Sequence, residues 1–208
     1  MRTIRAAERR RPFEVGTQLA LLMLGLEFLD LGLMLGLDRY GILPRSQGGI
    51  VGILVAPTLH AGFGHLFSNL LPFWVLSFFL FSDRSYRPYQ TLAWIWIGAG
   101  LGTWAIGRAY DNPSGLRTTH IGASSLIYGM VAYLIVAGLA LRRWRPIAVS
   151  VIVFGVFGSI FYGVLPRVDG VSWEAHLSGA LAGVSAAIVL HRRPRQRPNR
   201  PPRRRPRS

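Results

Sequence analysis

The sequence contains neither cysteine nor lysine, and it has few acidic residues for its length of 208. Without cysteine there are no disulfides, no thiolate nucleophile and no cysteine-ligated zinc or iron–sulfur site, and the redox compartment stays undetermined. The zinc-protease motif H-E-x-x-H is also absent. Nine acidic residues stand against 24 basic ones, all arginine, for a net charge of +15.

What the sequence has in abundance is apolar residues, which make up 50% of the chain and give a mean hydropathy of +0.33. A helix needs about 20 apolar residues to cross a bilayer. Six runs approach this length: 14–37, 57–81, 91–109, 121–141, 146–165 and 174–191. The first run carries Glu27 and Asp30 and has no small-x-small cleavage site, so we expect a retained helix and not a signal peptide. The pattern predicts an all-α polytopic membrane protein, a six-helix bundle over residues 14–191.

Arginine placement predicts the orientation of this bundle. If both termini are cytoplasmic, the inner segments hold 19 arginines and the outer segments hold five, as the positive-inside rule favours. Residues 1–13 then form a basic cytoplasmic tail, and the Arg/Pro-rich residues 192–208 form a disordered one. We interpret these tails as topology anchors at anionic lipid, and expect no nucleic-acid partner.

Polar side chains inside the runs are the candidates for function, because they are costly in lipid unless paired or used. In the expected orientation His65 and Asn69, Ser124, and His176 all lie in the outer layer of the membrane, on the second, fourth and sixth runs. His65 and Asn69 are spaced i, i+4 and share a helix face. Gly179 begins a stripe of small residues just after His176, which allows close helix packing.

These groups suit nucleophilic catalysis. A serine hydroxyl needs an adjacent base, and His176 is the candidate base for Ser124. An oxyanion needs donors, and His65, Asn69 and the backbone N–H at Ser124 are available. Gly122 leaves room for a substrate backbone. Since Glu174 at a helix mouth is the only acid in runs two to six, a Ser–His dyad is favoured over a triad.

At these residues the sequence resembles the rhomboid intramembrane serine proteases. The resemblance lies in three motifs: H-x4-H-x3-N (His60, His65, Asn69), G-x-S (Gly122, Ser124) and H-x2-G (His176, Gly179). It implies cleavage of transmembrane segments of other membrane proteins by Ser124 and His176, without metal or cofactor.

The resemblance also implies roles for supporting residues. Tyr128 would pack against His176, and His60 would support the loop and packing of the second run. Gly179 and Gly183 would seat the sixth run against the fourth. The implied partners are transmembrane substrates and the bilayer, while the oligomeric state, substrate and pathway stay open.

Two departures from the family pattern stand out. The usual G-x-S-G is here G-A-S-S, with Ser125 in the last position. The outer loop 38–56 lacks the family's Trp-Arg pair and has GILPR, Gly41 to Arg45, instead. This loop and the fifth run are alternative gates for substrate entry.

Two other functions stay open. One is a catalytically inactive rhomboid-like module that binds membrane proteins, although such a module is expected to lack the serine or the histidine. The other is a haem or metal carrier using His60, His65, His120 and His176. The all-arginine basic set suits a GC-rich genome, so we expect a bacterial cytoplasmic membrane location.

Overall fold

A computed structural model describes residues 2–109, 119–166 and 171–192, with side chains from Pro12 onward. The expected disordered tail falls almost entirely outside these residues. The long helices are α1 (Arg2–Leu33), α3 (Phe63–Ser82), α4 (Pro88–Ile106), α5 (Ser124–Leu141), α6 (Trp144–Phe157) and α7 (Trp173–Leu190). A short helix α2 (Gly49–Val55) and four 3-10 helices, η1 (Leu37–Tyr40), η2 (Ala56–Thr58), η3 (Arg84–Tyr86) and η4 (Gly158–Val164), complete the described elements.

Within the part of the chain that the structure describes, five segments are long and apolar enough to cross a membrane: Pro12–Leu33, Phe63–Ser82, Ser124–Leu141, Trp144–Val164 and Trp173–Leu190. The prediction of an all-α polytopic membrane protein is therefore confirmed. Helix α4 lies at the expected third run but is not among these five. The count of six spans and the side of the termini stay predictions.

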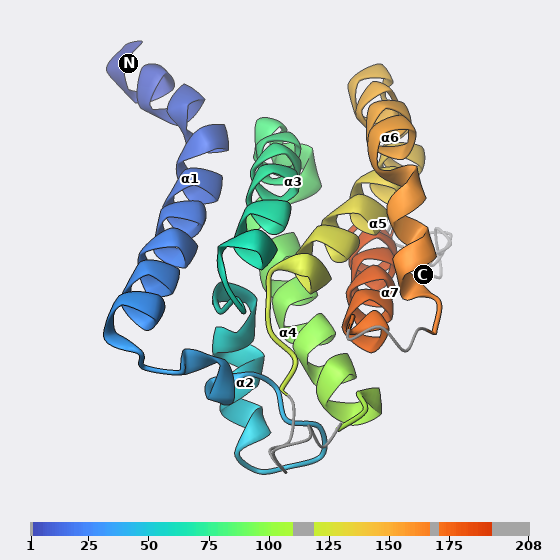
Figure 1. Cartoon of the computed structure of the whole chain (residues 1–208). Helices are drawn as coiled ribbons and strands as arrows, with labels where there is room; N and C mark the ends of the chain where they lie inside the picture. Colours follow the sequence, from blue (N-terminus) through green and yellow to red (C-terminus); the bar gives the residue numbers. More distant parts are fainter. Residues whose placement is uncertain (1, 110–118, 167–170, 193–208) are drawn as a thin grey trace, which may run out of the picture.

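Helix α5 forms the centre of the bundle. Figure 1 shows α1 at one side and α6 at the other, with α5 and α7 between them. In its apolar window 67% of the α5 residues are buried, against 17% for α1 and 11% for α6. The two outer helices therefore present most of their surface to the surroundings, which suits lipid.

Helices α5 and α7 approach closely because glycines face backbone. A Cβ at Gly179 would lie 2.1 Å from the carbonyl oxygen of Ser125, and one at Gly183 would lie 2.0 Å from that of Gly129. Real Cβ atoms are not found so near other atoms. This contact of α7 with α5 is the one that the sequence motif implied for Gly179 and Gly183.

The second apolar run differs from its expected form at its start. Helix α3 begins at Phe63 and not at residue 57, because Pro57 lies in η2 and Gly62 has a φ of +101°. Proline restricts the residue before it, and a positive φ is costly for residues with a Cβ. His60 therefore lies in the segment before α3, whereas His65 and Asn69 lie on α3.

The outer loop 38–56 is more ordered than the expected connection, because it contains α2. Glycines let α2 pack on the rest of the loop: a Cβ at Gly49 would lie 2.0 Å from Leu43 O, and one at Gly52 would lie 2.3 Å from Gly41 O. Arg45 donates from Nη1 to the carbonyls of Ala105 (3.1 Å) and Gly107 (2.8 Å) at the end of α4. The loop is thereby fixed at one end of the bundle, where α2 lies beside the lower part of α4 in Figure 1.

The two acids of α1 have structural partners at the same end. Asp30 accepts a hydrogen bond at Oδ1 from the N–H of Leu37 (2.9 Å), which ties the helix to the turn that follows it. Glu27 is 3% exposed, and the backbone of Gly62, the residue just before α3, lies near its carboxylate. These contacts join α1 to α3 and to the outer loop.

Candidate active site

The segment that leads into α5 is held on both sides by backbone hydrogen bonds. Ile42 and His120 form an antiparallel bridge, with N···O distances of 2.9 Å in both directions. The N–H of Gly122 donates to Ala56 O (2.9 Å), and the N–H of Ala123 donates to His60 Nε2 (3.4 Å). The chain therefore enters α5 along a fixed path, with Ser124 as the first helical residue.

Ser124 and His176 meet between α5 and α7. His176 Nε2 lies 3.0 Å from Ser124 Oγ, and its Nδ1 lies 3.0 Å from the carbonyl oxygen of Gly163. A carbonyl can only accept a hydrogen bond, so Nδ1 carries the proton. In the neutral ring Nε2 then has a free electron pair directed at the serine hydroxyl. This tautomer is the one that a general base requires.

Gly163 was not foreseen as part of the site. It lies near the end of η4, where terminal carbonyls lack partners within the helix and can accept from other groups. A Cβ at Gly163 would lie 1.7 Å from Tyr128 Oη and 3.3 Å from His176 Nδ1. The position therefore has to be glycine for the two rings to fit. A backbone acceptor leaves no side-chain signature, so the only sequence signal was one glycine among many.

Tyr128 packs against His176 as the motif implied. Their rings are stacked with centroids 4.0 Å apart and planes inclined by 9°. Tyr128 lies one turn after Ser124 on α5, so a single helix supplies both the serine and the surface on which the imidazole rests. The stacking fixes the rotation of the imidazole, and the Gly163 carbonyl fixes its tautomer.

His65 lies beside the loop that precedes Ser124. Its Nδ1 accepts from the N–H of Ala61 (3.4 Å), which leaves the ring proton on Nε2. A Cβ at Gly122 would lie 2.7 Å from His65 Nε2, and Gly122 has a φ of +103°. Glycine is thus required here by both the contact and the backbone. The arrangement brings an N–H donor next to the residues that lead to Ser124.

Asn69 is joined to His65 and not to the serine. It is 5% exposed, and its Nδ2 donates to His65 O at 2.9 Å. An amide nitrogen has two hydrogens, so this bond uses one of them. The structure brings His176 into contact with Ser124, Tyr128 and Gly163, and it places His65 beside Gly122, with Asn69 joined to His65.

His60 supports the segment that leads into α5, through its contact with Ala123. It is 2% exposed, and its ring lies 5.1 Å from that of His65. Burial, and then the charge of a protonated His65, lowers the pKa of His60 to about 4. His60 is therefore neutral near pH 7, which it has to be for Nε2 to accept from Ala123. This contact accounts for the supporting role that the motif implied.

A second polar network holds the start of α7. His120 Nε2 donates to Arg108 O (3.0 Å), and its Nδ1 accepts from the hydroxyl of Ser172. Ser172 is the N-cap of α7 and accepts from the N–H of Ala175 (3.3 Å). Burial lowers the pKa of His120, which keeps it neutral in these roles. His176 follows on the next turn, so its position depends on this cap.

Arg108 strengthens the same network. Its Nε donates to Oε1 of Glu174, whose side chain is 1% exposed, and its guanidinium lies 5.3 Å from the centre of the Trp173 ring. The acid that follows the α7 cap is thus paired with a cation. Among the described residues, no group of three or more His, Asp or Glu side chains is arranged to hold a metal ion.

Together, the helical bundle and the paired serine and histidine define an integral, multi-pass membrane protein with a hydrogen-bonded Ser–His pair between two of its helices. The chain matches the family model of the Rhomboid domain over residues 47–193, and it belongs to the rhomboid family. A protein of Mycobacterium tuberculosis, named only as uncharacterised, is 43% identical over 157 residues, 74% of this chain and 65% of that protein. The chain thus spans just under two thirds of this relative.

Two further relatives match most of the length of this chain. An uncharacterised protein of Mycobacterium leprae is 39% identical over 177 residues, 84% of this chain and 69% of its own length. A putative rhomboid protein of Acanthamoeba polyphaga mimivirus is 27% identical over 146 residues, 70% of this chain and 78% of that protein.

Proposed function

We propose that this protein is an intramembrane serine protease that cleaves transmembrane segments of other membrane proteins through a Ser124–His176 dyad. The observation that carries the proposal is the tautomer of His176. Its Nδ1–H is held by the Gly163 carbonyl, and its Nε2 lies 3.0 Å from Ser124 Oγ. A serine and a histidine that merely filled the core would not require a basic nitrogen directed at the hydroxyl.

The reaction follows from these positions. Ser124 Oγ attacks the carbonyl carbon of the substrate peptide bond while its proton passes to His176 Nε2. Collapse of the tetrahedral intermediate returns that proton to the leaving amine and leaves an ester on Ser124. Water then gives its proton to Nε2 and attacks the ester, and the acid product leaves as the proton returns to Oγ.

The negative charge of the intermediate needs donors close to Ser124. The N–H of Ser124 is the first of α5 and has no acceptor within its helix, and the helix dipole favours an anion there. His65 Nε2–H and the second amide hydrogen of Asn69 are the side-chain donors on this side. The structure shows no hydrogen bond from either side chain to Ser124 within the described residues, so we expect substrate binding to bring these donors to the oxyanion.

The orientation places the dyad near the outer face of the membrane, with both termini in the cytoplasm. The arginine distribution supports this orientation. A substrate helix has to unwind locally before its peptide bonds are accessible, so substrates with glycine, proline or small polar residues near the outer boundary are favoured. The expected membrane is the bacterial cytoplasmic membrane.

The alternative is an inactive rhomboid-like module that binds membrane proteins without cutting them. The described residues give this module no specific support, because both members of the dyad are present and in contact. The alternative is therefore the outcome to which a negative result below would lead.

The test is covalent labelling of the purified protein with a fluorescent fluorophosphonate, which needs no knowledge of the substrate. We expect the parent and Ser125→Ala to be labelled, and Ser124→Ala and His176→Ala to be silent. Ser125→Ala is the matched control, because it removes a neighbouring hydroxyl from the same helix turn. Equal labelling of all four, or none in a folded parent, would refute the dyad.

A further inference from the structure

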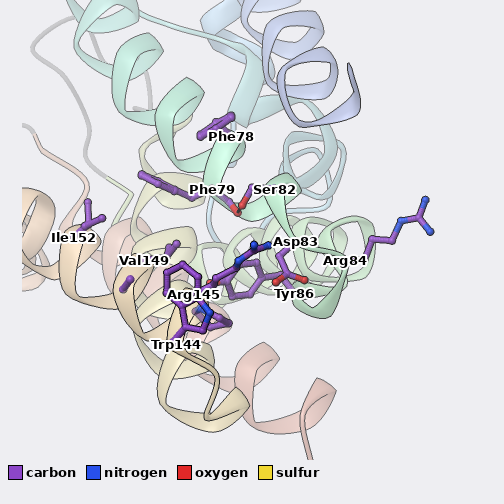
Figure 2. Close-up of a pocket in the computed structure, with 12 residues that line it drawn as sticks. Phe78, Phe79, Ser82, Asp83, Arg84, Tyr86, Trp144, Arg145, Val149 and Ile152 are labelled. Atoms are coloured by element: carbon purple, nitrogen blue, oxygen red, sulfur yellow. Dashed lines mark hydrogen bonds between the residues drawn. The ribbon is translucent and has the colours of Figure 1, made fainter. Parts of the chain in front are cut away.

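A cavity of about 600 Å³ lies at the end of the bundle that carries neither Ser124 nor the outer loop. Its walls come from the last turns of α3, from η3 and from the first half of α6. Figure 2 shows Phe78 and Phe79 on one side of it and Val149 and Ile152 on the other. The mechanism proposed above uses none of these residues.

The lining is amphipathic. The four residues just named are apolar, whereas Arg145 and Asp83 lie toward the chain connections. Figure 2 shows Arg84 reaching away from the other side chains of the lining. Asp83 accepts from the N–H of Ser85 at Oδ1 (2.8 Å), so it is already engaged in capping η3.

The position of the cavity matches a membrane boundary. The candidate span of α3 ends at Ser82, and the span that contains α6 begins at Trp144. Arg142 and Arg143 follow α5 directly, Arg145 is the second residue of α6, and all three are exposed. Phospholipid phosphates lie at the boundary between the bilayer and water, next to basic side chains, and the acyl chains lie deeper in the bilayer.

Tyr86 supplies an independent sign of a ligand. The residue lines the cavity, is 1% exposed, and its hydroxyl has no hydrogen-bond partner among the residues that the structure describes. Its backbone carbonyl is fixed by donors from Tyr133 and from Thr91 (2.8 Å), so the ring is firmly placed. An unpaired buried hydroxyl is costly, and a ligand that accepts its proton would remove this cost.

We propose that this cavity, the α3–α6 cavity, binds one anionic phospholipid of the cytoplasmic leaflet. Its phosphate accepts hydrogen bonds from Arg145 and from the hydroxyl of Tyr86, and an acyl chain lies between Phe79 and Ile152. The side chain of Trp144 is 74% exposed and Arg145 is also exposed, so a headgroup can reach this part of the lining from outside the bundle. The proposal depends on the orientation given above but not on protease activity.

The lipid would join two helices that share little contact. Only 11% of the window that contains α6 is buried. This helix continues into η4, and η4 provides the Gly163 carbonyl that holds His176. A lipid wedged between α3 and α6 would therefore steady the element that fixes the tautomer of the proposed base.

The test measures retention of phosphatidylglycerol and phosphatidylcholine by the full-length protein, using native mass spectrometry and thermal melting in detergent. We expect the parent to retain one phosphatidylglycerol in preference to phosphatidylcholine and to melt at a higher temperature with it. Arg145→Gln and Tyr86→Phe should each weaken retention about tenfold, the value of one hydrogen bond to a charged group. Arg143→Gln is the matched control, with the same loss of charge outside the cavity lining, and should behave as the parent does.

Each alternative result would overturn the proposal. Equal retention of the two lipids would mean an apolar groove without headgroup recognition. An Arg143→Gln effect as large as that of Arg145→Gln would mean diffuse attraction to the arginine cluster. A drop in the melting temperature of lipid-free Tyr86→Phe would mean that the hydroxyl already has a protein partner. None of these readouts depends on Ser124, so they are separable from failure of the proposed activity.

Discussion

Substituting Gly179 by alanine tests the geometry of the dyad without touching either of its members. The added Cβ would lie 2.1 Å from Ser125 O, whereas ordinary contacts begin near 3.4 Å. Helices α5 and α7 therefore have to separate by about 1.3 Å, the difference between these two distances. Ser124 and His176 lie on either side of this contact, so their 3.0 Å separation would grow beyond hydrogen-bonding range.

Two effects of different size follow from this separation. Overpacking costs about 1–3 kcal/mol of stability. Misplacing a catalytic group by about 1 Å costs on the order of 100-fold in rate. We expect the rate of fluorophosphonate labelling, and of cleavage of a model transmembrane substrate, to fall about 100-fold in a protein that still melts cooperatively.

Two further glycines act as controls. A Cβ added at Gly25 on α1 would have no atom within 4 Å, so Gly25→Ala should label at the parental rate. Gly183→Ala makes an equally severe contact, at 2.0 Å from Gly129 O, but one turn deeper. It should cost as much stability as Gly179→Ala with a smaller loss of labelling. Labelling of Gly179→Ala within twofold of the parent would refute the reasoning.

The remaining predictions concern groups around the dyad. Gly163→Ala should abolish labelling, because its Cβ would lie 1.7 Å from Tyr128 Oη; retained labelling would show that this carbonyl does not hold the base. Tyr128→Phe should keep most of the activity and Tyr128→Leu should lose about tenfold or more, measured as kcat, because only the leucine removes the stacked ring. Arg108→Gln should lower the free energy of unfolding by about 1.5–3 kcal/mol in chemical denaturation, because it leaves the buried Glu174 carboxylate without its cation; an unchanged value would contradict that pairing. The pKa of His60 is about 4 in the folded protein and about 6.5 in the unfolded chain, so the unfolded state takes up the proton first as the pH falls. The free energy of unfolding should therefore fall by up to about 3 kcal/mol between pH 6.5 and pH 4. Thermal melting of His60→Gln over the same pH range should lack this part of the pH dependence.

Much of the fold was predictable because a bilayer imposes strong rules on sequence. Apolar runs of helical length gave the all-α membrane class, and i, i+4 spacing placed His65 and Asn69 on one helix. The predicted start of the second run was wrong because His60 follows an apolar stretch that is typical of a helix, whereas Pro57 and Gly62 prevent one. Helix α2 was not predicted because seven residues are too few for a clear periodic signal.

The sequence could predict only those parts of the candidate site that are formed by side chains. Ser124 and His176 stood out because polar groups are rare in lipid. The acceptor at Gly163, by contrast, is a peptide carbonyl, and every residue has one. The cap formed by Ser172 and His120 was equally invisible, because it joins residues that are distant in sequence and ordinary in type.

A backbone carbonyl at His176 has consequences for the proposed chemistry. It selects the tautomer as a carboxylate would, but it is neutral and stabilises the imidazolium of the transition state less, because charge-assisted hydrogen bonds are about twice as strong. The face of Tyr128, 4.0 Å away by ring centroids, offers the developing cation a negative surface instead. The acid that follows the α7 cap, Glu174, pairs with Arg108, so its charge does not compete within the site. Orientation by a carbonyl and support by an aromatic face would thus let the proposed dyad operate inside a membrane, where a buried carboxylate would itself be costly.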